Sequence, residues 1–283
     1  MRKLAIVVVS VFFTLSAAAQ VTPKTVHFMS DDGKTRLTGY LWLPQGHGPH
    51  PAVVMMHGRH GAYSSLAHGV YDAHTLTKRH KMWGEFWAER GYVALHVDGF
   101  GPRGYPAGFA KGTYSDRPEE LNEVTIRPFD AYGALRYLRT RNDVAADRIG
   151  LQGWPNGASA TLSSMARNTL GMKDPTPETG FRAAIAFYPG CGLQDHYKKA
   201  YRTYAPVLLA IGTADEEVSP RLCQALNETG TRDGARIEFV LYTGAEHDFD
   251  DPGNKKQSVA ANRKAKEDSM RRAEAFFSRY LKP

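Results

Sequence analysis

Short apolar runs alternate with longer amphipathic stretches along most of this chain. Residues 51–56, P-A-V-V-M-M, are continuously apolar, as is typical of a parallel strand that helices cover on both faces. Comparable runs occupy residues 92–98, 148–153, 182–188, 206–212 and 236–242. Helical patterns separate them, including one that ends at Gly91, one centred on residues 129–139 and one that begins at Asn156. The alternation predicts an α/β fold with right-handed crossovers and a mostly parallel, doubly wound sheet flanked by helices.

The two ends of the pattern differ from its middle. Residues 25–30 and 36–44 alternate around the turn D-D-G-K, which predicts an antiparallel pair of strands at a sheet edge. The last helix carries one apolar face, which we expect to pack on the sheet. This face consists of Met270, Ala273, Phe276, Phe277, Tyr280 and Leu281.

The N-terminus has the three regions of a secretory signal peptide. Two basic residues precede a short apolar run and the small residues S-A-A-A, so we expect cleavage after Ala19. The run is shorter than the roughly 20 residues of a spanning helix, although a retained anchor is the alternative. We therefore expect residues 1–19 to be removed and residues 20–283 to form one domain. The protein is then periplasmic or secreted, without a membrane contact after cleavage.

The composition is that of an ordinary globular protein, with 42% hydrophobic and 23% charged residues in 283. The net charge of +7 includes Arg2 and Lys3, so loss of residues 1–19 leaves +5. Basic residues are spread along the chain and no nucleic-acid motif is present, which argues against a nucleic-acid partner.

Histidine and cysteine raise two further questions. His57 and His60 lack the partners of an H-E-x-x-H motif, so we expect no metal site. Cys191 and Cys223 are candidates for a disulfide in an oxidising compartment, but their spacing leaves the bridge undecided.

Three strand ends carry the groups that acyl transfer requires. The glycine-framed turn G-W-P-N-G follows the run at 148–153 and has the form of a nucleophile elbow with Pro155 at the nucleophile position. Asp215 and His247 follow the runs at 206–212 and 236–242. An imidazole activates a hydroxyl by taking its proton, and a carboxylate fixes the imidazole's tautomer. The alternative is that Asp215 only caps a helix near Ser219 or binds a turn amide.

The remaining parts of such a site also have candidates. The loop H-G-R-H-G would supply an oxyanion-hole amide from Arg59, and Asn156 would supply the other. The Gly- and Pro-rich loop at 99–117 is a candidate wall of a pocket for an apolar or anionic acyl group, although packing explains it nearly as well. Its candidate residues are Phe100, Arg103, Tyr105 and Phe109.

Together these stretches resemble the dienelactone hydrolase family of α/β-hydrolases, in its exported bacterial branch. The similarity rests on M-M-H-G-R-H-G, D-G-F-G-P-R-G, Q-G-W-P-N-G-A-S-A-T-L, F-Y-P-G-C-G, I-G-T-A-D-E-E-V-S-P and Y-T-G-A-E-H-D-F-D, and covers residues from about 25 to 280. The resemblance implies an α/β-hydrolase fold. It also implies hydrolysis of small carboxylic esters or lactones through a serine or cysteine acyl-enzyme, without metal or organic cofactor.

Pro155 departs from that pattern. Proline has no hydroxyl or thiol, and its φ is held near −65°, whereas the nucleophile of an elbow is normally strained. We therefore predict a relaxed elbow and a displaced Asn156 amide. Ser159 lies roughly 6 Å further along the helix axis, which is too far for the same geometry. Ser163, Ser164 and Cys191 are also poor substitutes.

Three explanations follow. In the first, the chain is a natural relative of the hydrolases that has lost catalytic activity and keeps a ligand-binding pocket. In the second, it is a working hydrolase sequence with one altered residue. In the third, it is a weak catalyst in which His247 activates water directly. A different class of function is an exported binding protein that captures esters or lactones in the same cleft. The sequence decides neither whether the protein is an enzyme nor its substrate or oligomeric state.

Overall fold

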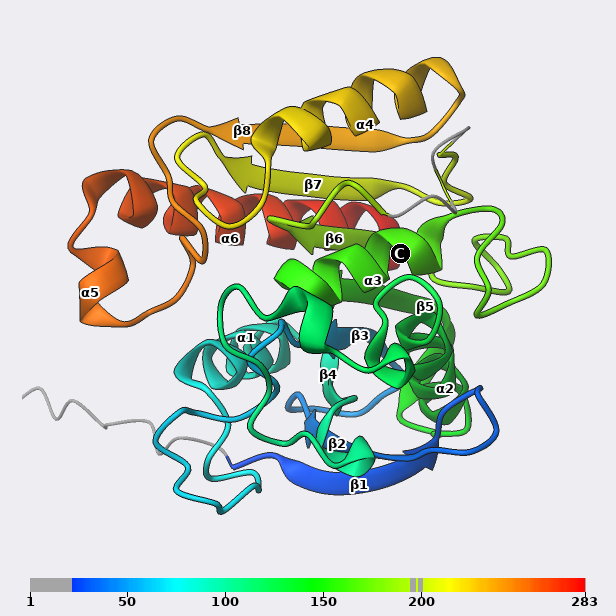
Figure 1. Cartoon of the computed structure of the whole chain (residues 1–283). Coiled ribbons are helices and arrows are strands. Elements are labelled where there is room, and N and C mark those ends of the chain that lie inside the picture. Colours follow the sequence, from blue (N-terminus) through cyan, green and yellow to red (C-terminus); the bar gives the residue numbers. More distant parts are fainter. Residues whose placement is uncertain (1–21, 194–196, 198–200, 283) are drawn as a thin grey trace, which may run out of the picture.

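The sheet is mostly parallel and has antiparallel strands at one edge, as predicted. A computed structural model describes residues 22–193, 197 and 201–282, so the expected signal peptide lies outside the described residues. Eight described strands follow the order β1-β2-β4-β3-β5-β6-β7-β8 (Figure 1). Their bounds are β1 Lys24–Met29, β2 Arg36–Trp42, β3 His50–Met56, β4 Val93–Asp98, β5 Val144–Gly153, β6 Ala183–Phe187, β7 Val207–Gly212 and β8 Ile237–Tyr242. Strands β3 to β8 are parallel, whereas β2 runs antiparallel to both β1 and β4.

Helices cover both faces of this sheet. Their bounds are α1 Lys78–Glu89, α2 Arg127–Arg139, α3 Pro155–Met165, α4 Pro220–Arg232, α5 Asn254–Gln257 and α6 Ala260–Leu281. Helices α2 and α3 contact each other, and the Tyr132 hydroxyl donates to the carbonyl of Ser164 at 2.8 Å. On the opposite face, α1 meets α6 where the rings of Trp87 and Phe277 lie 5.2 Å apart. Figure 1 accordingly shows α3 in front of the strands and α6 behind them.

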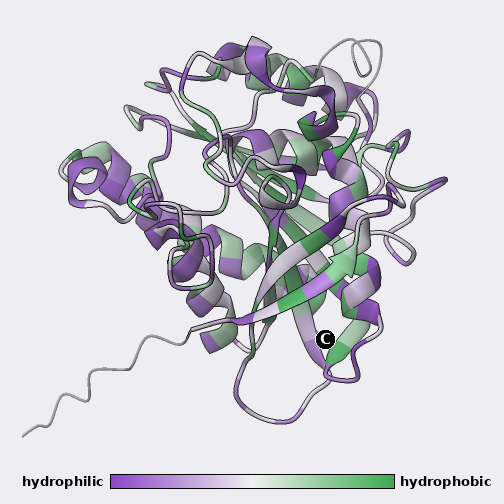
Figure 2. Cartoon of the chain, turned by 60° about the horizontal axis from the view of Figure 1, so that its bottom comes forward, coloured by the Kyte–Doolittle hydropathy of each residue, from purple (hydrophilic) through white to green (hydrophobic). Residues whose placement is uncertain are grey.

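The core lies between these layers, because the central strands are apolar on both sides. Residues 52–56 of β3 are fully buried, and Figure 2 shows the hydrophobic residues concentrated in the strands at the centre. The predicted face of the last helix is confirmed, since Phe276, Phe277 and Leu281 are buried and Met270 packs beside them. Among the described residues, no helix is both long and apolar enough to cross a membrane.

Parallel strands bring their carboxyl ends to one edge of the sheet. Strands β3, β5, β7 and β8 end at Met56, Gly153, Gly212 and Tyr242. The segments that follow these four ends carry all five candidate site residues, of which Pro155 and Asn156 begin α3. In open α/β sheets this edge is where ligands bind.

Candidate active site

The elbow between β5 and α3 is closely packed and depends on its two glycines. The Trp154 amide donates to the carbonyl of Met56 at 3.2 Å, which holds the turn against the end of β3. A Cβ on Gly157 would lie 2.1 Å from that carbonyl oxygen, and one on Gly153 would lie 2.2 Å from the Gly157 oxygen. Both contacts are closer than any side chain tolerates. The two glycines therefore permit the close packing expected of them.

Pro155 fits this turn as the first residue of α3, one residue earlier than the predicted helix start. Trp154 before it is extended, with φ −120° and ψ 157°, as a residue preceding proline prefers. Pro155 is not among the described non-glycine residues with positive φ, so the prediction of a relaxed elbow is confirmed. A proline in the first turn loses no helical hydrogen bond, because the first N–H groups of a helix have no partner within it.

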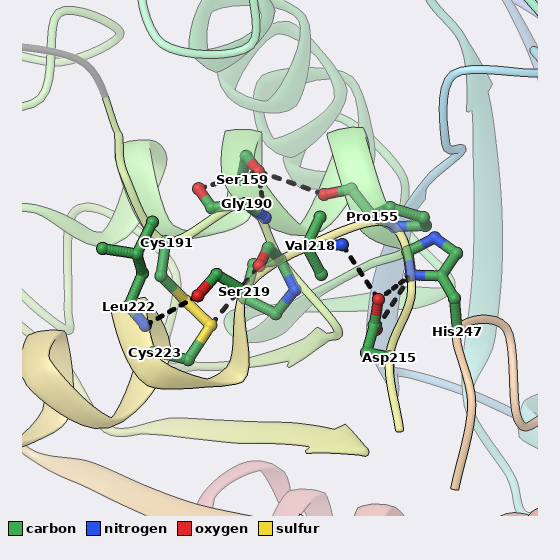
Figure 3. The surroundings of a disulfide bond; sticks show 11 residues. Pro155, Ser159, Gly190, Cys191, Asp215, Val218, Ser219, Leu222, Cys223 and His247 are labelled. Carbon is green, nitrogen blue, oxygen red and sulfur yellow. Dashed lines mark hydrogen bonds and ion pairs between the residues drawn. A yellow bond between two sulfur atoms is a disulfide. The ribbon is translucent and has the colours of Figure 1, made fainter. Parts of the chain in front are cut away.

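Asp215 and His247 come together as the sequence predicts (Figure 3). Nδ1 of His247 lies 3.0 Å and 2.9 Å from the two carboxylate oxygens of Asp215. The same carboxylate accepts the backbone N–H groups of Glu217 and Val218, at 3.0 Å and 2.9 Å, which fixes its position. The helix-cap alternative is wrong, since the hydroxyl of Ser219 caps α4 instead. Asp215 thus binds turn amides and orients the imidazole at once.

The electrostatics of His247 favour its charged form. Its side chain is 2% exposed, and that burial lowers the pKa of the imidazole. The hydrogen bond with Asp215 and the charges of Asp248, Asp215 and Glu217 act in the opposite direction, and the pKa ends above its ordinary value. The acidic groups around His247 therefore favour the protonated ring.

Arg59 and Asn156, the two candidates for the oxyanion hole, lie at the same cavity as His247. The side-chain amide of Asn156 donates to Glu123 at 2.8 Å and accepts a hydrogen bond from Arg127. Arg127 also donates to the carbonyl of His57 at 2.8 Å and is fully buried. One guanidinium therefore ties the loop after β3 to the start of α3, the two segments whose amides would form the hole.

Pro155 and His247 line two cavities. The larger has a volume of about 510 Å³ and the smaller about 370 Å³, and Arg59 also lines both. The loop at 99–117 does form a wall, since Lys111, Gly112 and Arg117 line the larger cavity.

The four residues proposed for that wall are not the ones that form it. Phe100 is buried against the His57 ring at 4.5 Å, and Tyr105 stacks on Phe109 at 5.4 Å. Arg103 pairs with Asp130 at 2.8 Å and with Asp32 at 2.9 Å. None of the four lines the two cavities, so that expectation was wrong: their side chains serve packing and ion pairing.

The possible substitute nucleophiles are engaged elsewhere. The Ser159 hydroxyl donates to the carbonyl of Pro155 at 3.1 Å and accepts from the Gly190 amide at 2.9 Å (Figure 3). Ser163 and Ser164 are buried and donate to helix carbonyls four residues earlier. Cys191 forms a disulfide with Cys223, with a Cα–Cα distance of 5.0 Å. This bridge, undecided from sequence, joins the loop after β6 to α4.

A buried acidic network behind the site was missed by the sequence reasoning. The Asp250 carboxylate accepts the indole N–H groups of Trp83 and Trp154, at 2.7 Å and 2.8 Å, and the hydroxyl of Tyr188. Asp248 forms an ion pair with Arg79 of α1. The acidic stretch D-F-D after His247 was the available signal, but its partners are far away in the sequence.

Nothing in the described part of the chain gathers the ligands of a metal site. Among those residues, no group of three or more His, Cys, Asp or Glu side chains is placed to hold an ion. The expectation of chemistry without metal or organic cofactor stays a prediction.

The sheet order, the elbow and the Asp–His pair at one sheet edge are those of an α/β-hydrolase fold. The profile of the dienelactone hydrolase family matches residues 37–281, and the chain belongs to this family. A probable 2-oxo-3-(5-oxofuran-2-ylidene)propanoate lactonase from Bradyrhizobium sp. is 24% identical over 229 residues, which cover 77% of this chain and 80% of the relative.

Solved structures show the same fold. Esterase 2 of Thermogutta terrifontis, phosphorylated by paraoxon, has a TM-score of 0.66 at 20% identity, covering 94% of this chain and 97% of the esterase. A dienelactone hydrolase-like promiscuous phosphotriesterase from metagenomic libraries has a TM-score of 0.65 at 19% identity, covering 92% of this chain and 98% of that structure. At these identities the likeness concerns the fold.

Proposed function

We propose that this protein carries the site of a carboxylic ester or lactone hydrolase whose covalent step is disabled at Pro155. The observation that carries the proposal is the contact of His247 with both carboxylate oxygens of Asp215, beside cavities that Pro155 also lines. Membership of the dienelactone hydrolase family supports it, as do the lactonase and esterase names of its relatives.

The chemistry follows from which atoms are present. In an intact site a hydroxyl or thiol at the elbow attacks the ester carbonyl, His247 takes its proton, and Asp215 stabilises the imidazolium. The Arg59 and Asn156 amides would stabilise the developing oxyanion. Pro155 has no proton to give and no lone pair for the attack, so no acyl-enzyme forms at this position.

The second candidate is a binding protein for small esters or lactones. It is favoured by the cavity of about 510 Å³, which is kept open next to a site that lacks its nucleophile. A thermal shift with intact ester and no turnover supports this function. The absence of any shift across a panel of esters and lactones contradicts it.

We propose export for the mature chain. The N-terminal pattern of residues 1–19 is that of a secretory signal, and the Cys191–Cys223 disulfide is typical of oxidising compartments. Intact mass of the exported protein tests this, since a mass that still includes Met1 contradicts cleavage.

The experiment that tests the hydrolase proposal is restoration of the nucleophile. Hydrolysis of a short activated aryl ester is compared for the protein as written, Pro155→Ser and the matched control Pro155→Ala. We expect turnover only in Pro155→Ser, at least about 10³-fold above the protein as written, because only that variant regains a hydroxyl. An organophosphate should then add mass only to the peptide that contains position 155.

Two further results decide between the alternatives. Adding Ser159→Ala to Pro155→Ser should leave the turnover in place, because Ser159 is hydrogen-bonded within the helix and to Gly190. If Pro155→Ser is inactive, the hydrolase proposal fails, and the result favours the binding function. If the protein as written is already fast, a nucleophile other than position 155 is at work.

A further inference from the structure

The Nε2 atom of His247 faces a carboxylate where an active hydrolase would have a hydroxyl. Oε2 of Glu217 lies 3.6 Å from Nε2, while Nδ1 on the other side of the ring contacts Asp215. Both acids belong to the loop between β7 and α4. The imidazole therefore lies between two carboxylates, and Nε2 is the atom that would have to accept the nucleophile's proton.

Glu217 is held in this position by Arg59. The guanidinium donates from Nε to Oε2 at 3.0 Å and from Nη2 to Oε1 at 2.8 Å, a two-pronged contact that fixes the carboxylate plane. Burial raises the pKa of Glu217, but the hydrogen bond from Arg59 and the charge of His247 outweigh it and lower that pKa. The carboxylate next to Nε2 is thus ionised and oriented.

The geometry points to Glu217 as the residue that takes the place of the missing hydroxyl at Nε2 of His247 and forms an ion pair with the protonated ring. The inference rests on the proposed function, because it concerns the base of the same site. It bears on the explanation in which His247 activates water, because the ring can do so only after Nε2 has lost its proton. It also means that a serine restored at position 155 competes with Glu217 for Nε2.

Asp215 and Asp248 raise the pKa of His247 more than Glu217 does, but Glu217 is the acid whose carboxylate lies at Nε2. Glu216 accepts the backbone N–H of His247 at 3.1 Å rather than contacting the ring, and the charge of Asp248 is paired with Arg79. The Tyr188 ring packs 4.9 Å from the imidazole and its hydroxyl is bound to Asp250. Lys111 is a second cation beside Glu217, with its Nζ 3.8 Å from Oε1. The other charged and titratable groups that contact His247 or line the two cavities with it are Asp215, Glu216, Asp248, Asp251, Glu123, Arg59, Arg79, Arg117, Lys78, His60, His80, Tyr63 and Tyr188.

The test that needs no activity is an NMR titration of the His247 ring in the full-length protein with Pro155 in place. We expect Glu217→Gln to move the midpoint to lower pH. The matched control is Glu246→Gln, which also removes a neighbouring acid, but one paired with Lys256 and Asn262 away from the ring. A midpoint shift in Glu217→Gln no larger than that in Glu246→Gln overturns the inference.

Glu217→Gln also frees the charge of Arg59, which by itself would lower the midpoint. The double variant Arg59→Gln with Glu217→Gln removes one charge of each sign and corrects for this. We expect its midpoint still to lie below that of the protein as written, because the carboxylate is the group that faces Nε2. A midpoint equal to that of the protein as written assigns the effect to Arg59 and overturns the inference.

Activity gives an independent readout in the Pro155→Ser background. We expect the acidic limb of the pH–rate profile to move to lower pH when Glu217→Gln is added, with a larger rate at neutral pH. Coincident profiles overturn the role of Glu217 while leaving the hydrolase proposal intact. If Pro155→Ser shows no turnover, the hydrolase proposal fails, and the NMR titration alone decides the inference.

Discussion

The two halves of the candidate site differ in what they keep. The half built by β7 and β8 retains both of its groups in contact, with Asp215 on Nδ1 of His247. The half built by β3 and β5 retains the two tightly packed glycines of an elbow, yet its turn is relaxed and carries Pro155 where chemistry requires a nucleophile. The packing of the turn and its chemistry are therefore separable here. Proline is easily accommodated at the start of α3, so the fold does not depend on the lost group.

The largest effect is expected when the nucleophile is restored by Pro155→Ser and the histidine is then removed. In the Pro155→Ser background, His247→Ala should reduce kcat by about 10³-fold or more, because the hydroxyl then has no base. Ester hydrolysis at saturating substrate measures the effect. Equal rates with and without His247 would mean that the restored hydroxyl is activated by another group.

The network around Asp250 joins the two halves and is the next largest expected effect. Its carboxylate holds Trp154 of the elbow and lies three residues after His247. Asp250→Ala leaves two buried indole N–H groups and the Tyr188 hydroxyl without their acceptor. We expect a loss of about 3 to 5 kcal/mol in the free energy of unfolding, measured by urea denaturation.

The matched control for that variant is Asp147→Ala. Asp147 is 77% exposed and lies 3.7 Å from Arg148, so its removal should change the free energy of unfolding by less than about 0.5 kcal/mol. Similar losses in the two variants would show that the Asp250 network does not hold the halves together.

The sequence predicted which strand ends form this site better than it predicted which charged side chains face one another there. The buried parallel strands read as continuous apolar runs, and Asp215 and His247 stand directly after two of them, so the motif and the fold agree. The role of Glu217 was hidden, because D-E-E offers adjacent acids and only the path of the loop shows which one faces Nε2.

Contacts between distant parts of the chain could not be predicted from the sequence either. Trp154 and Trp83 lie 96 and 167 residues from Asp250, and no local spacing links them. The aromatic and arginine residues of the 99–117 loop suggested a pocket wall, because such side chains can contact either a ligand or other parts of the protein. Composition indicates that Phe100 or Arg103 finds partners, but it does not indicate which partners.

Removing the disulfide tests whether the bridge stabilises the wall of the larger cavity, next to the half of the site that keeps Asp215 and His247. Cys191 and Cys223 are 32 residues apart and connect the loop that contains Gly190, Gly192 and Leu193 to α4. Replacing both cysteines by serine should lower the free energy of unfolding by about 2 to 4 kcal/mol, because the unfolded chain gains freedom. Chemical denaturation of the oxidised protein and the double variant measures this. Equal stabilities would show that the wall is held without the bridge.

The smallest effect is the contribution of His247 to the dependence of stability on pH, which should have the opposite sign to that of His80 near the elbow. On the intact side the folded-state pKa of His247 is raised, so His247 adds stability that is full below about pH 6.5 and is lost as pH rises through the folded value. Behind the elbow, burial and the charge of Arg79 lower the pKa of His80 to about 3. His80 therefore favours folding above about pH 6.5 and loses that contribution as pH falls towards 3.

A comparison of two stability curves separates the contribution of His247 from those of the other titrating groups. Urea denaturation across pH 4 to 9 gives the free energy of unfolding for the protein as written and for His247→Asn, and subtraction isolates His247. We expect the difference to shrink as pH rises, because a neutral imidazole no longer forms an ion pair with Asp215. The effect is small because burial works against the attraction of the acids. A difference that grows with pH would mean that His247 is neutral in the folded protein, and its contribution would then have the same sign as that of His80.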